Sequence, residues 1–185
     1  IKQLIKGYNS RPWNSHASEI TTVVFDNTFA NCDAVTSTSY WFDDCKNLTT
    51  ITGLEHLNTT NVTYMSGMFC NCSSLKSIDL SSFSTSKVTS MTNMFAGCTM
   101  LETLDLSHFN TSNVTSMNLM FERCSSLRSV DISHFETAKV EDLSSMFWGC
   151  SSLTSVDVSN FETGKLKTTS GMFHFCSSLE TIYAD

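Results

Sequence analysis

The chain has 185 residues, a formal net charge of −7 at neutral pH and only 11 lysine and arginine residues. Nucleic acids and anionic membrane surfaces attract basic proteins, so this acidic balance disfavours both as partners. The sequence has no run of about 18 apolar residues, and we therefore expect no part of it to insert into a membrane.

The first 45 residues match the rest of the chain only in part. Residues 1–19, which include Tyr8, Pro12 and Trp13, resemble no later segment. Residues 20–45 contain a predicted strand at 23–26 and end in Trp41-Phe42-x-x-Cys45, a motif similar to one that recurs further along. We interpret residues 20–45 as a diverged first unit of a repeated architecture.

A 26-residue pattern then repeats to the C-terminus. Its clearest markers are five evenly spaced cysteines, each three residues after a Met-Phe pair: Cys72, Cys98, Cys124, Cys150 and Cys176. A fixed period of this size predicts a solenoid, in which each coil buries its apolar face against its neighbours. Because end coils are usually atypical, residues 1–19 are predicted to be the remnant of an N-terminal cap and residues 20–185 one repeat domain.

The first half of each coil predicts a strand. The segment Leu101-x-x-Leu104-x-Leu106 is the signature of a leucine-rich repeat, with a short strand at 104–106. Side chains alternate along a strand, so Leu104 and Leu106 should point inward while Thr103 and Asp105 point outward. The strands of successive coils are then predicted to form one parallel sheet.

The second half of each coil predicts a short helix. Its apolar residues are separated by three, three, one and three positions, which is helical periodicity: Val114, Met117, Met120, Phe121 and Cys124. Thr115 or Ser116 is the predicted N-cap. The predicted fold class is an α/β solenoid, a right-handed leucine-rich repeat superhelix with one parallel sheet and short helices on the opposite face.

Two irregularities interrupt the repeat. Positions 51 and 62 are eleven residues apart, whereas the equivalent positions 78 and 88 are ten apart, which predicts a one-residue insertion near Gly53, as a bulge after the strand. Residues 176–183 begin another coil and stop after its strand. We therefore expect about six coils with the last incomplete, and the chain looks like a fragment of a longer protein.

The unit C-S-S-L-x-S-[VI]-D-[LV]-S-x-F-x-T-x-x-[VL]-x-x-[ML]-x-x-M-F-x-x-C closely resembles the BspA-like leucine-rich repeats of bacterial surface proteins, a family also found in mycoplasmas and some parasitic protists. The match covers about residues 20–185. The resemblance implies an extracellular or cell-surface protein that takes part in adhesion, often to host matrix or plasma proteins. It supplies no catalytic motif and implies no cofactor.

The eight cysteines allow three interpretations. Neighbouring coils about 4.8 Å apart fall within the Cα range of a disulfide. We favour buried thiols, because the five regularly spaced cysteines fall on the inward face, where free cysteine behaves as a small hydrophobic residue. A metal site is disfavoured, since Cys70-x-Cys72 is the only close pair in the sequence. Cys32 and Cys70 lie outside the regular row.

Four aspartates form a second row, one on each predicted strand and pointing outward: Asp79, Asp105, Asp131 and Asp157. Like charges at this spacing are expected to raise one another's pKa, offset by hydrogen bonds from neighbouring hydroxyls at positions 77, 103, 129 and 155. With Glu102 and Arg128, the four aspartates are the candidate ligand-binding residues of the strand face. The alternative to a cation or ligand stripe, which we favour, is a solvated structural row that terminates or registers the strands, because an open row of carboxylates lacks the oxygen cage that calcium needs.

His108 and His134 occupy equivalent positions in adjacent coils. They could share a metal or sense pH, but histidines merely tolerated at a turn are the favoured interpretation, because no third ligand is near. We assign no metal ligands. We also assign no catalytic residues, because no serine lies in a Gly-x-Ser-x-Gly turn and no Ser/His/Asp set can be assembled.

The sequence thus predicts a monomeric, non-enzymatic binding or adhesion module whose strand face engages a host or matrix protein or a glycan. The alternative is a structural spacer or stalk that projects another domain from the cell envelope, which the serine- and threonine-rich exterior fits. An enzyme is disfavoured, because no insertion interrupts the 26-residue period to form a cleft.

Overall fold

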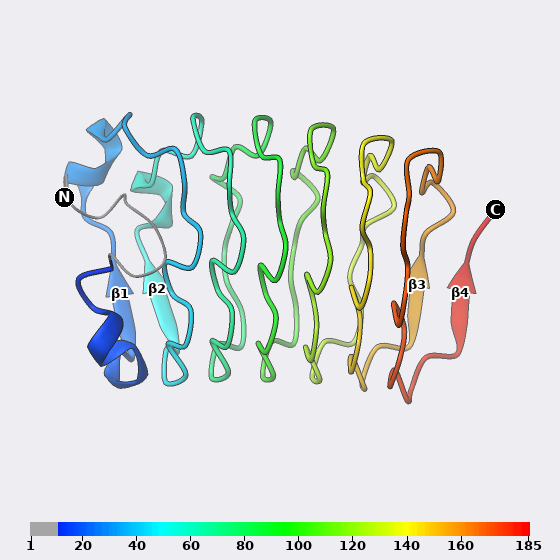
Figure 1. The fold of residues 1–185 in the computed structure, drawn as a ribbon. Coiled ribbons are helices and arrows are strands. Elements are labelled where there is room, and N and C mark those ends of the chain that lie inside the picture. Colours follow the sequence, from blue (N-terminus) through cyan, green and yellow to red (C-terminus); the bar gives the residue numbers. More distant parts are fainter. Residues whose placement is uncertain (1–10) are drawn as a thin grey trace.

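The structure is a computed structural model that describes residues 11–185 as coils stacked side by side in a single row (Figure 1). The predicted repeat solenoid is therefore confirmed. In chain order the elements are the 3-10 helix η2 (Asn14–Glu19), strand β1 (Thr22–Val24), 3-10 helix η3 (Asn27–Asn31), strand β2 (Thr50–Thr52), 3-10 helix η4 (Leu54–His56) and strands β3 (Ser155–Asp157) and β4 (Thr181–Tyr183).

The predicted single sheet is present only at the two ends of the stack. Strand β1 pairs in parallel with β2, and β3 pairs in parallel with β4, so the named strands form two separate two-stranded sheets. In the middle coils the equivalent segments carry no named strand, and single backbone bonds join some of them, such as Glu102 N–H to the Lys76 carbonyl at 3.0 Å and Thr154 N–H to the Arg128 carbonyl at 3.3 Å. The prediction of one continuous sheet is wrong for these coils.

A second line of backbone contacts runs through the whole stack. Parallel bridges join equivalent residues of successive coils, in the order Ser37, Tyr64, Ser90, Ser116, Asp142 and Thr168. After Tyr64 each step is 26 residues, whereas the first step is 27. The extra residue falls near Gly53, which has a φ of 74° and is followed by η4. A Cβ at this position would overlap the Phe25 carbonyl oxygen, so the irregular turn requires glycine.

The predicted helix at residues 114–124 is absent. Alternate N–H groups bond to the next coil, for example Leu119 to the Ser144 carbonyl, while the intervening ones bond three residues back, for example Met120 to Met117. Two residues per coil, four positions apart, have positive φ, as Leu119 does here at 60°. An α-helix does not tolerate such residues. The three-residue spacing of inward side chains therefore arises from consecutive turns.

The predicted N-caps have another role. Ser116 belongs to the row of parallel bridges, and the Thr115 hydroxyl donates to the Thr89 carbonyl of the preceding coil at 3.1 Å. Thr89 bonds in the same way to Thr63. These hydroxyls join coils to one another instead of capping a helix.

The inward and outward assignments are confirmed. Leu104 and Leu106 are buried, whereas Thr103 and Asp105 are exposed. At the centre of the core, six phenylalanine rings form a continuous stack with centroids 5.2–5.9 Å apart: Phe42, Phe69, Phe95, Phe121, Phe147 and Phe173. Offset stacking of this kind adds to the free energy of simple burial.

Buried threonines form a row that the sequence analysis did not single out: Thr59, Thr85, Thr111 and Thr137. The Thr111 hydroxyl donates to the Glu136 carbonyl at 3.1 Å and accepts the Glu136 N–H at 2.8 Å. Each of the other three makes the same pair of bonds to one residue of the following coil. One hydroxyl thus satisfies both backbone groups of that residue.

The regularly spaced cysteines are buried or half-buried free thiols. Each donates its S–H to the carbonyl of a phenylalanine in the preceding coil, as Cys98 does to Phe69 at 3.1 Å. Burial raises the pKa of the Cys98 thiol to about 12. Because the thiolate is the reactive form, burial keeps the fully buried cysteines in the unreactive thiol form.

Residues 11–19 pack against the first coil. The Arg11 guanidinium donates to the Asp43 carbonyl at 2.9 Å, and the Trp13 indole N–H donates to the Trp41 carbonyl at 2.8 Å. The predicted division between residues 19 and 20 stays a prediction. Tyr8 lies outside the described residues.

Candidate functional site

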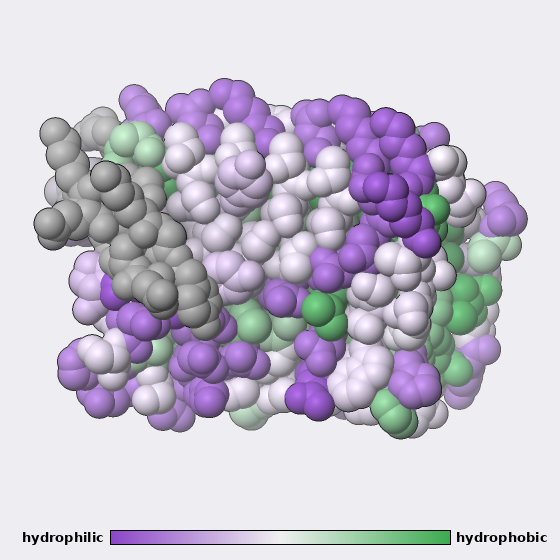
Figure 2. Space-filling model, in the orientation of Figure 1, coloured by the Kyte–Doolittle hydropathy of each residue, from purple (hydrophilic) through white to green (hydrophobic). Residues whose placement is uncertain are grey.

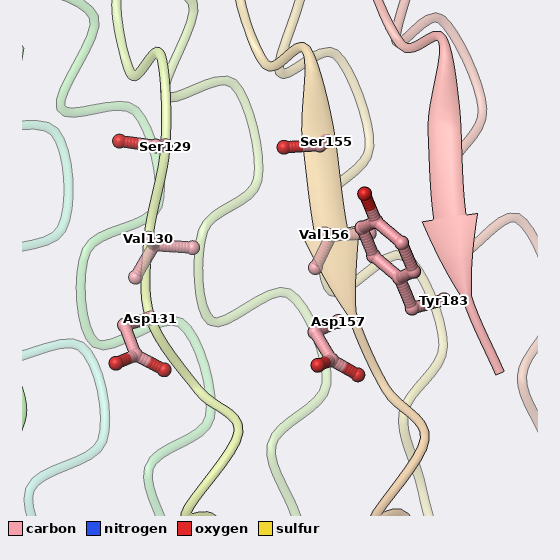
Figure 3. A pocket seen from close by; sticks show the side chains of 7 residues that line it. All are labelled: Ser129, Val130, Asp131, Ser155, Val156, Asp157 and Tyr183. Carbon is pink, nitrogen blue, oxygen red and sulfur yellow. The ribbon is translucent and has the colours of Figure 1, made fainter.

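The strand side of the stack is hollowed into a shallow trough. Two adjoining hollows of about 420 and 310 Å³ share Ser129, Val130 and Asp131. Together they extend from Ser77 to Tyr183, and aspartates, hydroxyl side chains and aliphatic side chains alternate along them. We call this surface the strand-face trough. Figure 3 shows one end of it, where Asp131 and Asp157 lie at the same level in adjacent coils.

The structure brings most of the predicted strand-face residues together. Asp105, Asp131 and Asp157 line the two hollows, and Asp79 lines a third hollow beside η4. Glu102 and Arg128 are exposed where the strand segments begin, but they line none of these hollows. The role of all six residues in ligand binding stays a prediction.

The trough is acidic. Asp105, Asp131 and Asp157 line its two hollows, and no lysine or arginine within residues 11–185 lines either of them. Its floor includes the aliphatic side chains of Leu104, Val130 and Val156. A ligand that fits this surface therefore combines positive charge with apolar contact.

Hydrogen bonds from serines fix the aspartate row. Asp131 Oδ1 accepts the Ser133 N–H at 3.0 Å and its hydroxyl at 2.7 Å, and Asp157 accepts both groups of Ser159 in the same way. Asp79 and Asp105 accept from the serines two positions later. These are Asx turns, in which a carboxylate closes a turn of its own backbone.

The expected increase in the pKa of these aspartates is wrong. Hydrogen bonds from Ser133 lower the pKa of Asp131, and those from Ser107 lower the pKa of Asp105. The pKa values of Asp79 and Asp157 are lowered for the same reason. Repulsion between neighbouring aspartates acts in the expected direction but is weaker, because the donors touch the carboxylates directly. The hydroxyls that donate are at 81, 107, 133 and 159, not at the predicted positions 77, 103, 129 and 155.

The lowered pKa values predict that acid destabilises the protein. A carboxylate with a lower pKa in the folded state contributes stability above its unfolded pKa, and this contribution is lost as pH falls through the folded pKa. We expect the urea midpoint to be flat above about pH 5 and to fall below about pH 4. A variant with Asn at positions 79, 105, 131 and 157 keeps the acceptor oxygens and should show a shallower fall. An equal fall of the urea midpoint in the wild type and the variant would contradict the assignment of this acid sensitivity to the aspartate row.

The two histidines form hydrogen bonds with backbone carbonyl groups of the preceding coil. His108 Nε2 lies 2.6 Å from the Leu80 carbonyl oxygen, and His134 Nε2 lies 3.0 Å from the Leu106 carbonyl oxygen. At the flanking positions, Ser82 and Asn160 bond to carbonyls of preceding coils in a similar manner. The histidines are structural links between coils. Within residues 11–185, no group of three or more His, Cys, Asp or Glu side chains could hold a metal ion.

The stacked coils and their leucine-rich strand segments define a repeat protein of the leucine-rich class. Models of the family described as "Mycoplasma protein of unknown function, DUF285" match residues 14–103, 36–131 and 102–184. The chain therefore belongs to this family. A search of curated proteins finds no significant match.

One solved structure of a bacterial protein shares the fold, and a second is a more distant match. A leucine-rich repeat protein from Eubacterium ventriosum is 21% identical, with a TM-score of 0.53 over 85% of this chain and 43% of its own. A leucine-rich cell surface protein from Faecalibacterium prausnitzii is 17% identical over 92% of this chain and 61% of its own, with a TM-score of 0.34. The Eubacterium structure confirms the resemblance to bacterial leucine-rich repeat proteins at the level of the fold. The chain spans less than half the length of the Eubacterium protein.

Proposed function

We propose that the protein is a non-enzymatic binding module of the bacterial cell surface, which engages a macromolecular partner along the strand-face trough. The observation that carries this proposal is the row of fixed, ionised carboxylates over aliphatic side chains, repeated from coil to coil. One extended partner could contact several coils at once, and its affinity would come from the sum of these contacts. We also propose that the stacked coils form a right-handed superhelix.

The charge of the trough favours a basic polypeptide segment as the partner. Three aspartates and no lysine or arginine from the described part of the chain line its two hollows, so lysine or arginine side chains of a partner would find complementary charge. Such complementarity mainly steers association and selects partners. Adhesion to a host or matrix protein is the setting that we propose for it. None of the helices in residues 11–185 is long and apolar enough to cross a membrane.

We expect Asp105→Asn combined with Asp131→Asn to weaken binding to a basic matrix protein about tenfold. Asparagine keeps the acceptor oxygen of the Asx turn, so the charge is removed while the fold is kept. The matched control is Glu136→Gln with Glu162→Gln, which removes two exposed charges that line no part of the trough. Biolayer interferometry against a panel of purified matrix proteins, at low and high salt, provides the measurement.

The contrary result is equally specific. The trough is not the recognition surface if the aspartate pair binds as the wild type does while the control pair loses binding. The same conclusion follows if Lys139→Glu and Lys165→Glu abolish binding and the aspartate pair does not. The spacer hypothesis would then be favoured. Figure 2 shows the observation behind it, a face dominated by residues of intermediate hydropathy without a large apolar patch at its centre.

A further inference from the structure

Two residues in each coil connect the stacked phenylalanine to the regularly spaced cysteine, and their identities vary while the flanking residues do not. The pairs are Asp43-Asp44, Cys70-Asn71, Ala96-Gly97, Glu122-Arg123, Trp148-Gly149 and His174-Phe175. Their backbone is fixed from coil to coil, as by the bond from Arg123 N–H to the Trp148 carbonyl at 2.7 Å. Variable side chains on a constant backbone are a suitable basis for recognition.

In three successive coils these pairs bring a cation and three rings together. The Arg123 guanidinium carbon lies 4.8 Å from the centroid of the Trp148 ring. Trp148 and Phe175 meet edge to face with centroids 5.2 Å apart, and the His174 ring lies 4.1 Å from Phe175. Phe175 is 62% exposed, although the side chain is large and apolar. We call Arg123, Trp148, His174 and Phe175 the aromatic patch.

Two members of the patch occupy backbone positions that favour glycine. Arg123 and Phe175 have φ values of 57° and 60°, and the equivalent residues Gly97 and Gly149 have values of 72° and 74°. A side chain in this conformation costs stability that glycine does not. Asp44 and Asn71 adopt the same conformation at the equivalent positions of earlier coils, so this backbone is common to the stack. The patch is distinguished by the large side chains that this backbone presents, of which Arg123 and Phe175 are exposed.

We propose that the aromatic patch is a second binding site, distinct from the strand-face trough, which takes a neutral pyranose ring of a glycan. The ring of Phe175, which is 62% exposed and stands edge to face with Trp148, offers an apolar face to the C–H groups of the sugar. Arg123, His174 and Glu122 supply polar groups for its hydroxyls. Glu122 lies 3.7 Å from Arg123, so the guanidinium charge is already balanced and does not select an acidic sugar.

The size of the patch also favours a sugar over a protein surface. A stable protein interface buries about 800 Å² on each partner around an apolar centre. The aromatic patch comprises four side chains from three coils, which matches one or two sugar rings. Serines surround it in the sequence, at 125, 126, 151, 152, 177 and 178, and they provide no apolar extension.

The experiment uses the 185-residue chain and an array of defined neutral hexose and N-acetylhexosamine oligosaccharides, with sialylated counterparts beside them. We expect neutral glycans to bind, and Trp148→Ala and Phe175→Gly each to weaken the strongest of them about tenfold or more in calorimetric titrations. Phe175→Gly places glycine where the backbone favours it, so this variant keeps its fold, which circular dichroism checks. The trough variants Asp105→Asn and Asp131→Asn should bind glycans as the wild type does.

Three results would overturn the inference: no neutral glycan binds, only sialylated glycans bind, or both patch variants bind as tightly as the wild type. A protein ligand that depends on Trp148 without any glycan binding would overturn the sugar assignment as well. The proposed function is tested separately, because it depends on polypeptide binding by the trough variants. Either proposal can therefore fail while the other stands.

Discussion

Replacing Phe121 with alanine is expected to lower the free energy of unfolding by about 3–5 kcal/mol. The ring is fully buried and stacks on Phe95 and Phe147 with centroids 5.9 and 5.2 Å away. Its removal leaves a cavity between two coils that the fixed backbone of the stack cannot close. Urea denaturation followed by circular dichroism measures the loss.

The control for this substitution is Val24→Ala, at a side chain that is 68% exposed. We expect it to change the free energy of unfolding by less than about 0.5 kcal/mol. A loss below about 1 kcal/mol for Phe121→Ala would mean that the phenylalanine stack is not the packed centre of the molecule.

Thr111→Val is expected to cost about 1–3 kcal/mol, although the two side chains have nearly the same shape. The substitution removes both the donor to the Glu136 carbonyl and the acceptor of the Glu136 N–H. Two backbone groups between adjacent coils then lose their partner at once. Thr111→Ser keeps the hydroxyl and should recover most of the loss in the same urea measurements.

The chain supplies a matched control for this effect. Thr163 occupies the equivalent position in the last complete coil, where it is exposed. Thr163→Val should leave the free energy of unfolding within about 0.5 kcal/mol of the wild type. Equal losses at positions 111 and 163 would contradict the role of the threonine row as a link between coils.

The arrangement of the core followed directly from the sequence, because a residue that recurs every 26 positions must pack on its own equivalents. Leu104, Phe121 and Cys124 lie inward for this reason. The helix prediction failed because apolar residues three positions apart fit consecutive turns as well as a helix. Gly67 and Gly97, both at positive φ, were the signal that could have separated the two.

The pKa values of the aspartates in the candidate site could not be predicted from the repeat spacing, because they depend on hydrogen-bond donors that the spacing does not locate. Asp105 was expected to respond to its neighbouring aspartates, which lie one coil away. The structure shows that Ser107, two residues along the chain, donates to its carboxylate. The sequence Asp-x-Ser recurs in every regular coil, and its preference for an Asx turn would have predicted the direction of the pKa shift. The aromatic patch was missed because its residues differ from coil to coil, and a search for periodicity disregards them.

The bonds between coils have a consequence for how the length of this protein can change. The thiol and hydroxyl bonds of the core each reach only the adjacent coil, as from Cys124 to Phe95 and from Thr85 to Asn110. Deleting residues 99–124 would join Cys98 to Ser125 with every row of equivalent residues still in register, and Phe95 would then stack on Phe147. Recombination between the repeats of a gene could therefore lengthen or shorten the molecule by whole coils, and so alter its reach without redesign of the core.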